Sequence, residues 1–289
     1  MSVTEIPRVH HRYVDVRGAR VFYREAGRPE EAPTLLLLHG FPASSHQYRR
    51  LIDALGTRYH LVAPDYPGFG YTEAPDGFRY SFEALTDVVE GFVDALSLRR
   101  VVPYVFDFGG PVGFRLAVRR PELIAGLIVQ NANAYEEGLS DLALAAIAHR
   151  PGAAGAEEGA RALLTPAMTR GQYEIGSPDP SLLPPDAWTL DQHFLDAPGR
   201  DAAQVALALD YHSNVAQYPV WQRWLREHRP PALVLWGRGD AIFLEAGARA
   251  YLRDLPEARL HVLDAGHFAL EERLPEIAPL VAEFLDGLR

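Results

Sequence analysis

The stretch Val105-Phe106-Asp107-Phe108-Gly109-Gly110 stands between an apolar run, Val101 to Phe106, and a helix-like segment, Pro111 to Arg120. A strand that turns sharply into a helix presents one side chain at the edge of a sheet, and small residues tolerate the tight backbone there. That side chain is usually a serine, but here it is Asp107, which is already an anion at pH 7. A carboxylate nucleophile suits displacement at an sp³ carbon, so the sequence favours C–O or C–halogen cleavage over acyl transfer.

Apolar runs and helical patterns alternate on both sides of this turn. Such alternation predicts an α/β fold in which helices cover both faces of a mostly parallel sheet. Pro103 lacks the N–H that a central strand donates, so we place it at the first turn of its strand. The expected strands are 13–16, 21–23, 34–39, 60–64, 101–106, 123–130, 232–236 and 259–263, and the expected helices are 45–55, 81–98, 111–120, 215–227, 244–252 and 271–288.

The alternation stops after Asn131. Residues from about 134 to 214 are rich in Ala, Pro and Gly and carry only short helical patterns, with a loop at Pro151 to Ala156. A helical insertion in an α/β core is best interpreted as a lid over the strand ends, where such sheets bind ligands. We therefore expect a core of residues 1–133 and 215–289 with a helical lid of residues 134–214.

The composition excludes several classes of function. The 289 residues carry a net charge of −10 and no basic stripe longer than two arginines, which argues against a nucleic-acid partner. There is no cysteine, so thiolate chemistry and disulfides are excluded, and all 28 basic residues are arginine, which excludes Schiff-base chemistry. Met1 to His10 has no signal-peptide pattern and Leu35 to Leu38 is too short to span a bilayer, so we expect a cytoplasmic protein without membrane partners. The sequence leaves its oligomeric state open.

Two further polar residues follow predicted strands at the sheet edge that presents Asp107. Asp240 comes after Leu233 to Trp236, and His267 comes after the strand that contains Val262. The order nucleophile, acid, histidine is that of the triad in α/β-hydrolases, so we predict Asp107, Asp240 and His267 as catalytic residues.

A second motif, His39-Gly40-Phe41-Pro42, ends the early central strand. In this topology that turn adjoins the turn at Asp107. We therefore expect the backbone N–H groups of Phe41 and Phe108 to form an oxyanion hole.

These motifs resemble the epoxide hydrolase and haloalkane dehalogenase branch of the α/β-hydrolase family. The matching stretches span most of the predicted core, whereas the lid carries much weaker signal. They are His39-Gly-Phe-Pro42, Asp65-Tyr-Pro-Gly-Phe-Gly-Tyr-Thr72, Asp107-Phe-Gly-Gly110, Trp236-Gly-Arg-Gly-Asp240 and Gly266-His-Phe268.

The chain departs from this family at two places. The family often has tryptophan after the nucleophile, where the indole N–H holds a departing halide, but Phe108 has no such donor. Members that defluorinate haloacids carry an arginine pair just after the nucleophile, whereas the first arginine here is Arg115. Both differences favour an epoxide substrate over a halide.

The resemblance also implies a lid tyrosine that protonates the epoxide oxygen. Tyr211, within Leu209 to Asn214, is the first candidate, and a phenol stays protonated at pH 7. Tyr135 and Tyr218 are alternatives that are more typical of structural residues, and Trp188 is a candidate donor to a halide from the lid. Trp221 and Trp224, at helical spacing, are expected in the core.

The sequence thus predicts a hydrolase that forms an alkyl ester on Asp107 and needs neither a metal nor an organic cofactor. An epoxide hydrolase is the first hypothesis, and a haloalkane or haloacid dehalogenase is the second. A small-ligand binding protein without catalytic activity also remains open, since a fold does not fix function. Ester hydrolysis by water that Asp240 and His267 activate is a weaker alternative.

Overall fold

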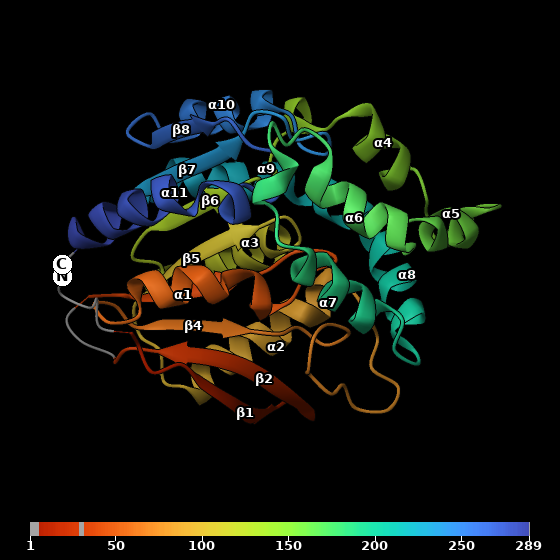
Figure 1. Cartoon of the computed structure of the whole chain (residues 1–289), viewed down its shortest axis with the longest axis horizontal. Helices are drawn as coiled ribbons and strands as arrows, with labels where there is room; N and C mark the ends of the chain where they lie inside the picture. Colours follow the sequence, from red (N-terminus) through yellow and green to blue (C-terminus); the bar gives the residue numbers. More distant parts are fainter. Residues whose placement is uncertain (1–5, 29–31, 289) are drawn as a thin grey trace.

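The computed structural model describes residues 6–28 and 32–288, so part of Met1–His10 lies outside the described residues. Its centre is an eight-stranded sheet with the order β1-β2-β4-β3-β5-β6-β7-β8 (Figure 1). The pairs β1–β2 and β2–β4 are antiparallel, and the other pairs are parallel. The strands are β1 (His10–Val16), β2 (Ala19–Ala26), β3 (Thr34–Leu38), β4 (Leu61–Pro64), β5 (Val101–Phe106), β6 (Leu127–Gln130), β7 (Ala232–Gly237) and β8 (Arg259–Leu263).

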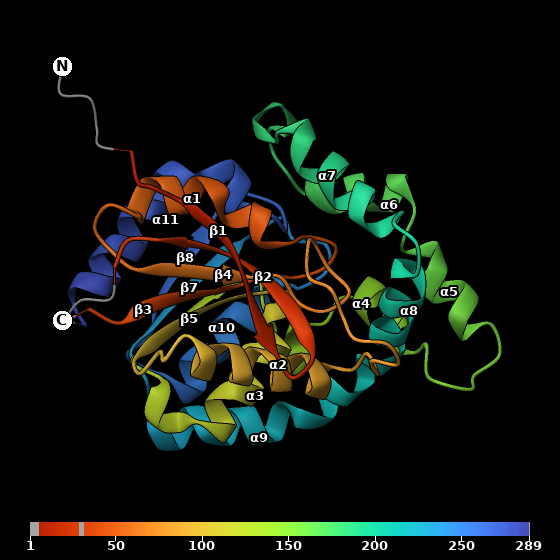
Figure 2. The ribbon, with the colours of Figure 1, turned by 90° about the horizontal axis from the view of Figure 1, so that it is seen from below.

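Helices cover both faces of this sheet, and Figure 2 shows the two layers edge-on. Side chains that alternate along a strand enter separate cores: Leu36 and Leu38 of β3 pack in one, and Leu35 and Leu37 pack in the other. The core helices are α1 (Arg49–Leu55) and α11 (Ala269–Asp286) on one face, and α2 (Phe82–Ala95), α3 (Gly109–Arg119), α9 (His212–His228) and α10 (Glu245–Asp254) on the other.

The predicted α/β-hydrolase fold is confirmed, with some corrections to its elements. Pro103 lies in the middle of β5 rather than in a turn, and the pairing of β5 with β6 begins one residue later, at Tyr104. The expected helix at 45–55 is a 3-10 turn, η1 (Ser45–Tyr48), followed by α1. Ser81 caps α2 as expected, since its hydroxyl accepts the Ala84 N–H at 3.1 Å.

A run of short helices separates β6 from β7 along the chain. In Figures 1 and 2, α4 to α8 lie together at one side of the core sheet, and we call these five helices the lid helices. Within the described ranges, every helix is too short or too polar to cross a membrane. The lid helices are α4 (Asp141–Ile147), α5 (Ala156–Ala162), α6 (Pro166–Glu174), α7 (Pro185–Leu195) and α8 (Arg200–Asp210), and short 3-10 turns lie at η2 (Pro121–Leu123), η3 (Glu136–Gly138) and η4 (Pro180–Leu182).

Candidate active site

Asp107 lies at the sharp turn between β5 and α3. Its φ of +47° is in the left-handed region, which residues with a Cβ rarely adopt. Two glycines make room for this turn: a Cβ on Gly109 would lie 2.0 Å from the Leu38 carbonyl oxygen, and a Cβ on Gly40 would lie 2.4 Å from the Asp107 Cβ. Any other residue would therefore collide with the Leu38 backbone at position 109 or with the Asp107 side chain at position 40.

The predicted triad residues meet at the carboxyl ends of their strands. The His267 Nδ1 lies 2.7 Å from Asp240 Oδ2, and the His267 Nε2 lies 3.9 Å from Asp107 Oδ2. All three side chains are buried, and Nε2 has no hydrogen-bond partner among the described residues. Because the carboxylate of Asp240 accepts the Nδ1 proton, Nε2 is left as a base that faces Asp107.

Asp240 is fixed by hydrogen bonds to both of its oxygens. The N–H groups of Ile242 and Phe243 donate to Oδ1 at 2.8 and 3.1 Å, and the Asn131 amide donates to Oδ2 at 2.7 Å. The Asn131 side chain also accepts the Gly237 N–H at 3.0 Å. Asn131 thus joins the ends of β6 and β7, a positioning role that the sequence analysis did not find.

The Asp107 carboxylate is held from the other side by backbone N–H groups. Phe41 N donates to Asp107 Oδ1 at 2.6 Å, and the Phe108 N–H also hydrogen-bonds the carboxylate. Oδ1 therefore occupies the position of the predicted oxyanion hole, while Oδ2 is the oxygen nearer His267. The two oxygens therefore have different surroundings.

The turn that supplies the Phe41 N–H rests on a buried histidine. His39 Nδ1 donates to the Gly40 carbonyl at 3.0 Å, and its Nε2 accepts the Tyr66 N–H at 3.3 Å. Burial lowers the pKa of His39 to about 4, so this imidazole is neutral in the physiological range. His39 therefore connects two backbone turns as a neutral imidazole.

Burial and charge oppose each other at the triad. Burial raises the pKa of Asp107, although His267 and the N–H groups of Phe41 and Phe108 favour its ionised form. Burial would lower the pKa of His267, but the attraction of Asp240 outweighs it, so the pKa lies above the ordinary 6.5. The pair thus combines a stabilised imidazolium with a carboxylate that is poorly solvated.

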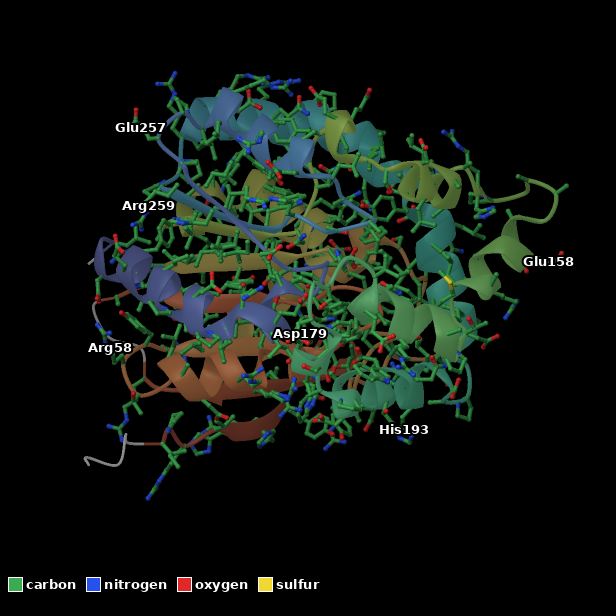
Figure 3. The ribbon with its side chains drawn as sticks, turned by 45° about the horizontal axis from the view of Figure 1, so that its top comes forward. Arg58, Glu158, Asp179, His193, Glu257 and Arg259 are labelled. Carbon is green, nitrogen blue, oxygen red and sulfur yellow. The ribbon has the colours of Figure 1, made fainter. Side chains whose placement is uncertain are left out.

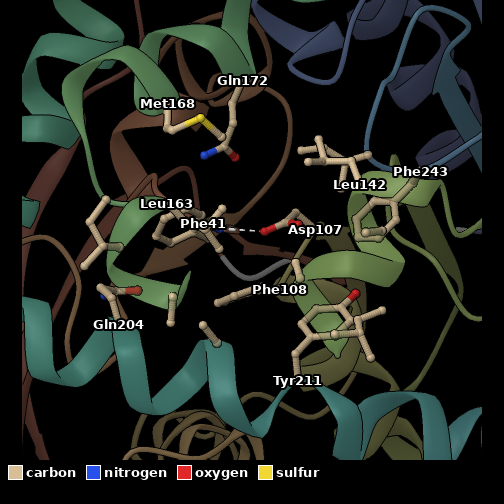
Figure 4. A pocket seen from close by; sticks show the side chains of 17 residues that line it. Phe41, Asp107, Phe108, Leu142, Leu163, Met168, Gln172, Gln204, Tyr211 and Phe243 are labelled. Atoms are coloured by element: carbon tan, nitrogen blue, oxygen red, sulfur yellow. Dashed lines mark hydrogen bonds between the residues drawn. The ribbon is translucent and has the colours of Figure 1, made fainter. Parts of the chain in front are cut away.

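Asp107 lines a cavity of about 120 Å³ that lies between the sheet edge and the lid helices (Figure 4). Its walls are mostly apolar, with Phe41, Phe108 and Phe243 from the core facing side chains of α4, α5, α6 and α8. In contrast, charged side chains such as Glu158, at the edge of the molecule in Figure 3, and Asp179 are exposed. The residues of the cavity wall that carry polar side chains are Asp107, Gln172, Gln204 and Tyr211.

Of the lid residues Tyr211, Tyr135 and Trp188, which were expected to stabilise a leaving group, Tyr211 is the one that lines the cavity. Tyr211 lines the cavity, and its ring lies 5.7 Å from that of Phe108. Its hydroxyl is hydrogen-bonded to Tyr218, which accepts the Asn133 amide at 3.2 Å. Burial raises the pKa of Tyr211, so the phenol keeps its proton.

Tyr135 and Trp188 lie outside the cavity wall. The Tyr135 hydroxyl donates to Asp254 Oδ2 at 2.8 Å, so this phenol has a buried partner of its own. Trp188 packs against Tyr173 of α6, with ring centroids 5.8 Å apart. Trp221 and Trp224 are buried in the core, as expected.

Sequence reasoning missed Gln172 and Gln204, the two amides of the cavity wall. They come from α6 and α8, in the part of the chain where motif signal is weakest. No group of three or more His, Asp or Glu side chains among the described residues is placed to hold a metal ion.

Comparison with known proteins places this geometry in a family. The family model described as alpha/beta hydrolase fold matches residues 33–274. The uncharacterized hydrolase YNR064C of Saccharomyces cerevisiae is 41% identical over 266 residues, which is 90% of this chain and 91% of that protein.

Two other similarities concern named activities. Haloalkane dehalogenase 2 of Mycobacterium bovis is 39% identical over 120 residues, which is 42% of this chain and 41% of that protein. The structure of the epoxide hydrolase CorEH matches with a TM-score of 0.78 and 19% sequence identity. The match covers 98% of this chain and 100% of that chain. At this identity the structural match shows a shared fold and nothing finer.

The geometry predicts that Asp240→Asn lowers the pKa of His267 below 6.5. Without the carboxylate, the desolvation of the buried imidazolium is no longer outweighed. Asp254→Asn is the matched control, because Asp254 is another buried carboxylate but pairs with Tyr135. NMR titration of the His267 ring nitrogens measures both variants. An unchanged pKa in Asp240→Asn would mean that this carboxylate does not hold the imidazolium.

Proposed function

We propose that this chain, a hydrolase of the α/β-hydrolase fold family, converts small organic epoxides to diols through an ester on Asp107. The observation that carries the proposal is that the two oxygens of the Asp107 carboxylate have different contacts. Oδ1 is held by the Phe41 N–H at 2.6 Å, and Oδ2 lies 3.9 Å from the His267 Nε2. A lid of residues 134–214 closes the cavity in this proposal.

The first step is displacement at carbon. Asp107 Oδ2 attacks one ring carbon of the epoxide, and the bond from that carbon to the ring oxygen breaks. Tyr211 protonates the oxygen as negative charge develops on it, which leaves a hydroxyalkyl ester and a phenolate. The position of Tyr211 in the cavity wall supports this role, and its raised pKa keeps the proton available.

The second step is hydrolysis of the ester. The His267 Nε2 removes a proton from water, and the resulting hydroxide attacks the Asp107 carboxyl carbon. The negative charge gathers on Oδ1, where the Phe41 N–H already donates, and the Phe108 N–H also hydrogen-bonds this carboxylate. Collapse releases the diol and restores the carboxylate, and the proton set free by ester hydrolysis returns to the Tyr211 phenolate.

Replacement of His267 by Gln is expected to trap the ester, because the first step needs no base and the second does. Incubation with an epoxide panel and mass spectrometry should show one substrate mass added to the peptide that contains Asp107. His193→Gln, at an exposed lid position, is the control and should turn over without accumulating an adduct.

Three outcomes of this experiment contradict the proposal. Normal turnover by His267→Gln would exclude His267 as the water-activating base. An adduct on another residue would exclude Asp107 as the nucleophile. A panel that raises the melting temperature but modifies neither protein would favour a binding protein on the same fold.

Haloalkane dehalogenation is the second candidate, favoured by the Gln172 amide. This lid side chain points into the cavity, where its N–H could donate to a halide (Figure 4). The relative named haloalkane dehalogenase 2 supports the same candidate. Haloacids fit less well, because the wall residues include no arginine: Arg115 donates to Asn214 Oδ1 at 2.7 Å and is absent from the wall.

Tyr211→Phe distinguishes the two candidates. Loss of the phenol should lower kcat/KM for an epoxide by about 100-fold, since an alkoxide is a poor leaving group without an acid. An alkyl bromide of the same chain length needs no proton, so its rate of ester formation should change little. Tyr135→Phe is the matched control and should leave both rates near those of the wild type, because Tyr135 lies outside the cavity wall. Equal losses for both substrates in Tyr211→Phe would exclude Tyr211 as the acid.

A further inference from the structure

One buried polar atom of the cavity wall has no partner. The described residues contain nine buried side-chain oxygen or nitrogen atoms without a hydrogen bond, and only Gln204 Oε1 belongs to a residue that lines the cavity. The Gln204 side chain is 2% exposed. A buried acceptor without a donor is costly, so such an atom calls for an explanation.

The orientation of this amide is fixed by the core. Gln204 Nε2 donates to the Gly68 carbonyl at 2.8 Å, which identifies the nitrogen and directs Oε1 away from Gly68. Gly68 belongs to the loop after β4, so the amide spans from α8 to the core. In Figure 4 the Gln204 oxygen is directed toward the middle of the cavity. The acceptor is therefore held in position before any ligand binds.

The surroundings of this acceptor define what it can bind. Leu163, Leu164 and Met168 line the same cavity, and its wall residues carry no cationic side chain. An anionic group would thus lack a counter-charge, and a second acceptor would face Oε1 without a proton. A neutral group with an O–H or N–H, carried on an apolar arm, satisfies both the charge and the hydrogen bond.

We propose that Gln204 Oε1 is the specificity determinant for an epoxide whose apolar arm ends in a hydroxyl or other neutral hydrogen-bond donor. This assignment of substrate class rests on the proposed function, since it takes the reacting end of the ligand to lie at Asp107. The apolar wall holds the arm, and Gln204 selects the neutral donor at its far end. Substrates without that donor leave Oε1 unpaired.

Matched substrates test the proposal. Terminal epoxides of increasing chain length are each paired with the analogue in which the last methyl is replaced by hydroxyl. At the chain length that reacts best, the wild type should have a higher kcat/KM for the hydroxyl substrate than for the methyl substrate. In Gln204→Met the ratio of these two values should fall about tenfold. The comparison is a ratio within one variant, so general damage from the lost Gly68 contact cancels. Gln172→Met, the same change in α6, should retain the preference.

A binding measurement separates this proposal from the proposed function. Calorimetry with unreactive 1-alkanols and with α,ω-diols of equal length needs no turnover. The diols should bind more tightly to the wild type, and the advantage should vanish in Gln204→Met but persist in Gln172→Met. If epoxides are turned over but neither the kcat/KM preference nor the diol advantage depends on Gln204, the subsite is overturned and the proposed function stands. A Gln204-dependent diol advantage without epoxide turnover would support the subsite and overturn the proposed function.

Discussion

A single buried carboxylate sets the requirements for the rest of the site. Asp107 is 5% exposed, and removing an anion from water is expensive unless hydrogen bonds and an opposite charge surround it. The Phe41 N–H and the His267 ring supply these from opposite sides. Phe41 and His267 both lie in turns that follow other strands, so the carboxylate is stabilised where three strand ends converge.

That convergence explains the unusual backbone at the sheet edge. The left-handed φ of Asp107 aims its side chain between these turns, and glycine at positions 40 and 109 lets the chains approach closely enough. Asn131, also at positive φ, ties the end of β6 to Asp240 and β7. Strain of this kind persists where the surrounding structure fixes it, and here it gathers at one reactive group.

The charges are arranged to favour one proton path. Both oxygens of Asp240 are occupied by hydrogen bonds, which fixes the His267 tautomer and leaves Nε2 toward Asp107. In the proposed mechanism His267 is the base that activates water, and its raised pKa reflects a stabilised conjugate acid. In the proposed mechanism Tyr211, which lines the cavity and has a raised pKa, is the complementary acid.

The sequence predicted the fold and the strand ends at which Asp107, Asp240 and His267 lie, because both follow from local patterns. Each of Asp107, Asp240 and His267 comes directly after an apolar run, and the strand order brings those ends together. Pro103 was misplaced because the rule against proline in a strand ignores which neighbour each residue pairs with. Gln204 and Asn131 could not be found, since their roles depend on partners at Gly68 and Asp240 that are distant in sequence. Tyr135 and Tyr211 look alike in the sequence, and only packing separates the phenol on Asp254 from the phenol in the cavity wall.

The central claim is that Asp107 bonds to the substrate instead of activating water, and oxygen isotopes test it most directly. Enzyme in excess over an epoxide, in water enriched in oxygen-18, should release a first-turnover diol without the label, because the new oxygen comes from the carboxylate. The label should then appear in the peptide that contains Asp107. Oxygen-18 in the first diol, with none in that peptide, would show that water attacks the epoxide directly and would contradict the account.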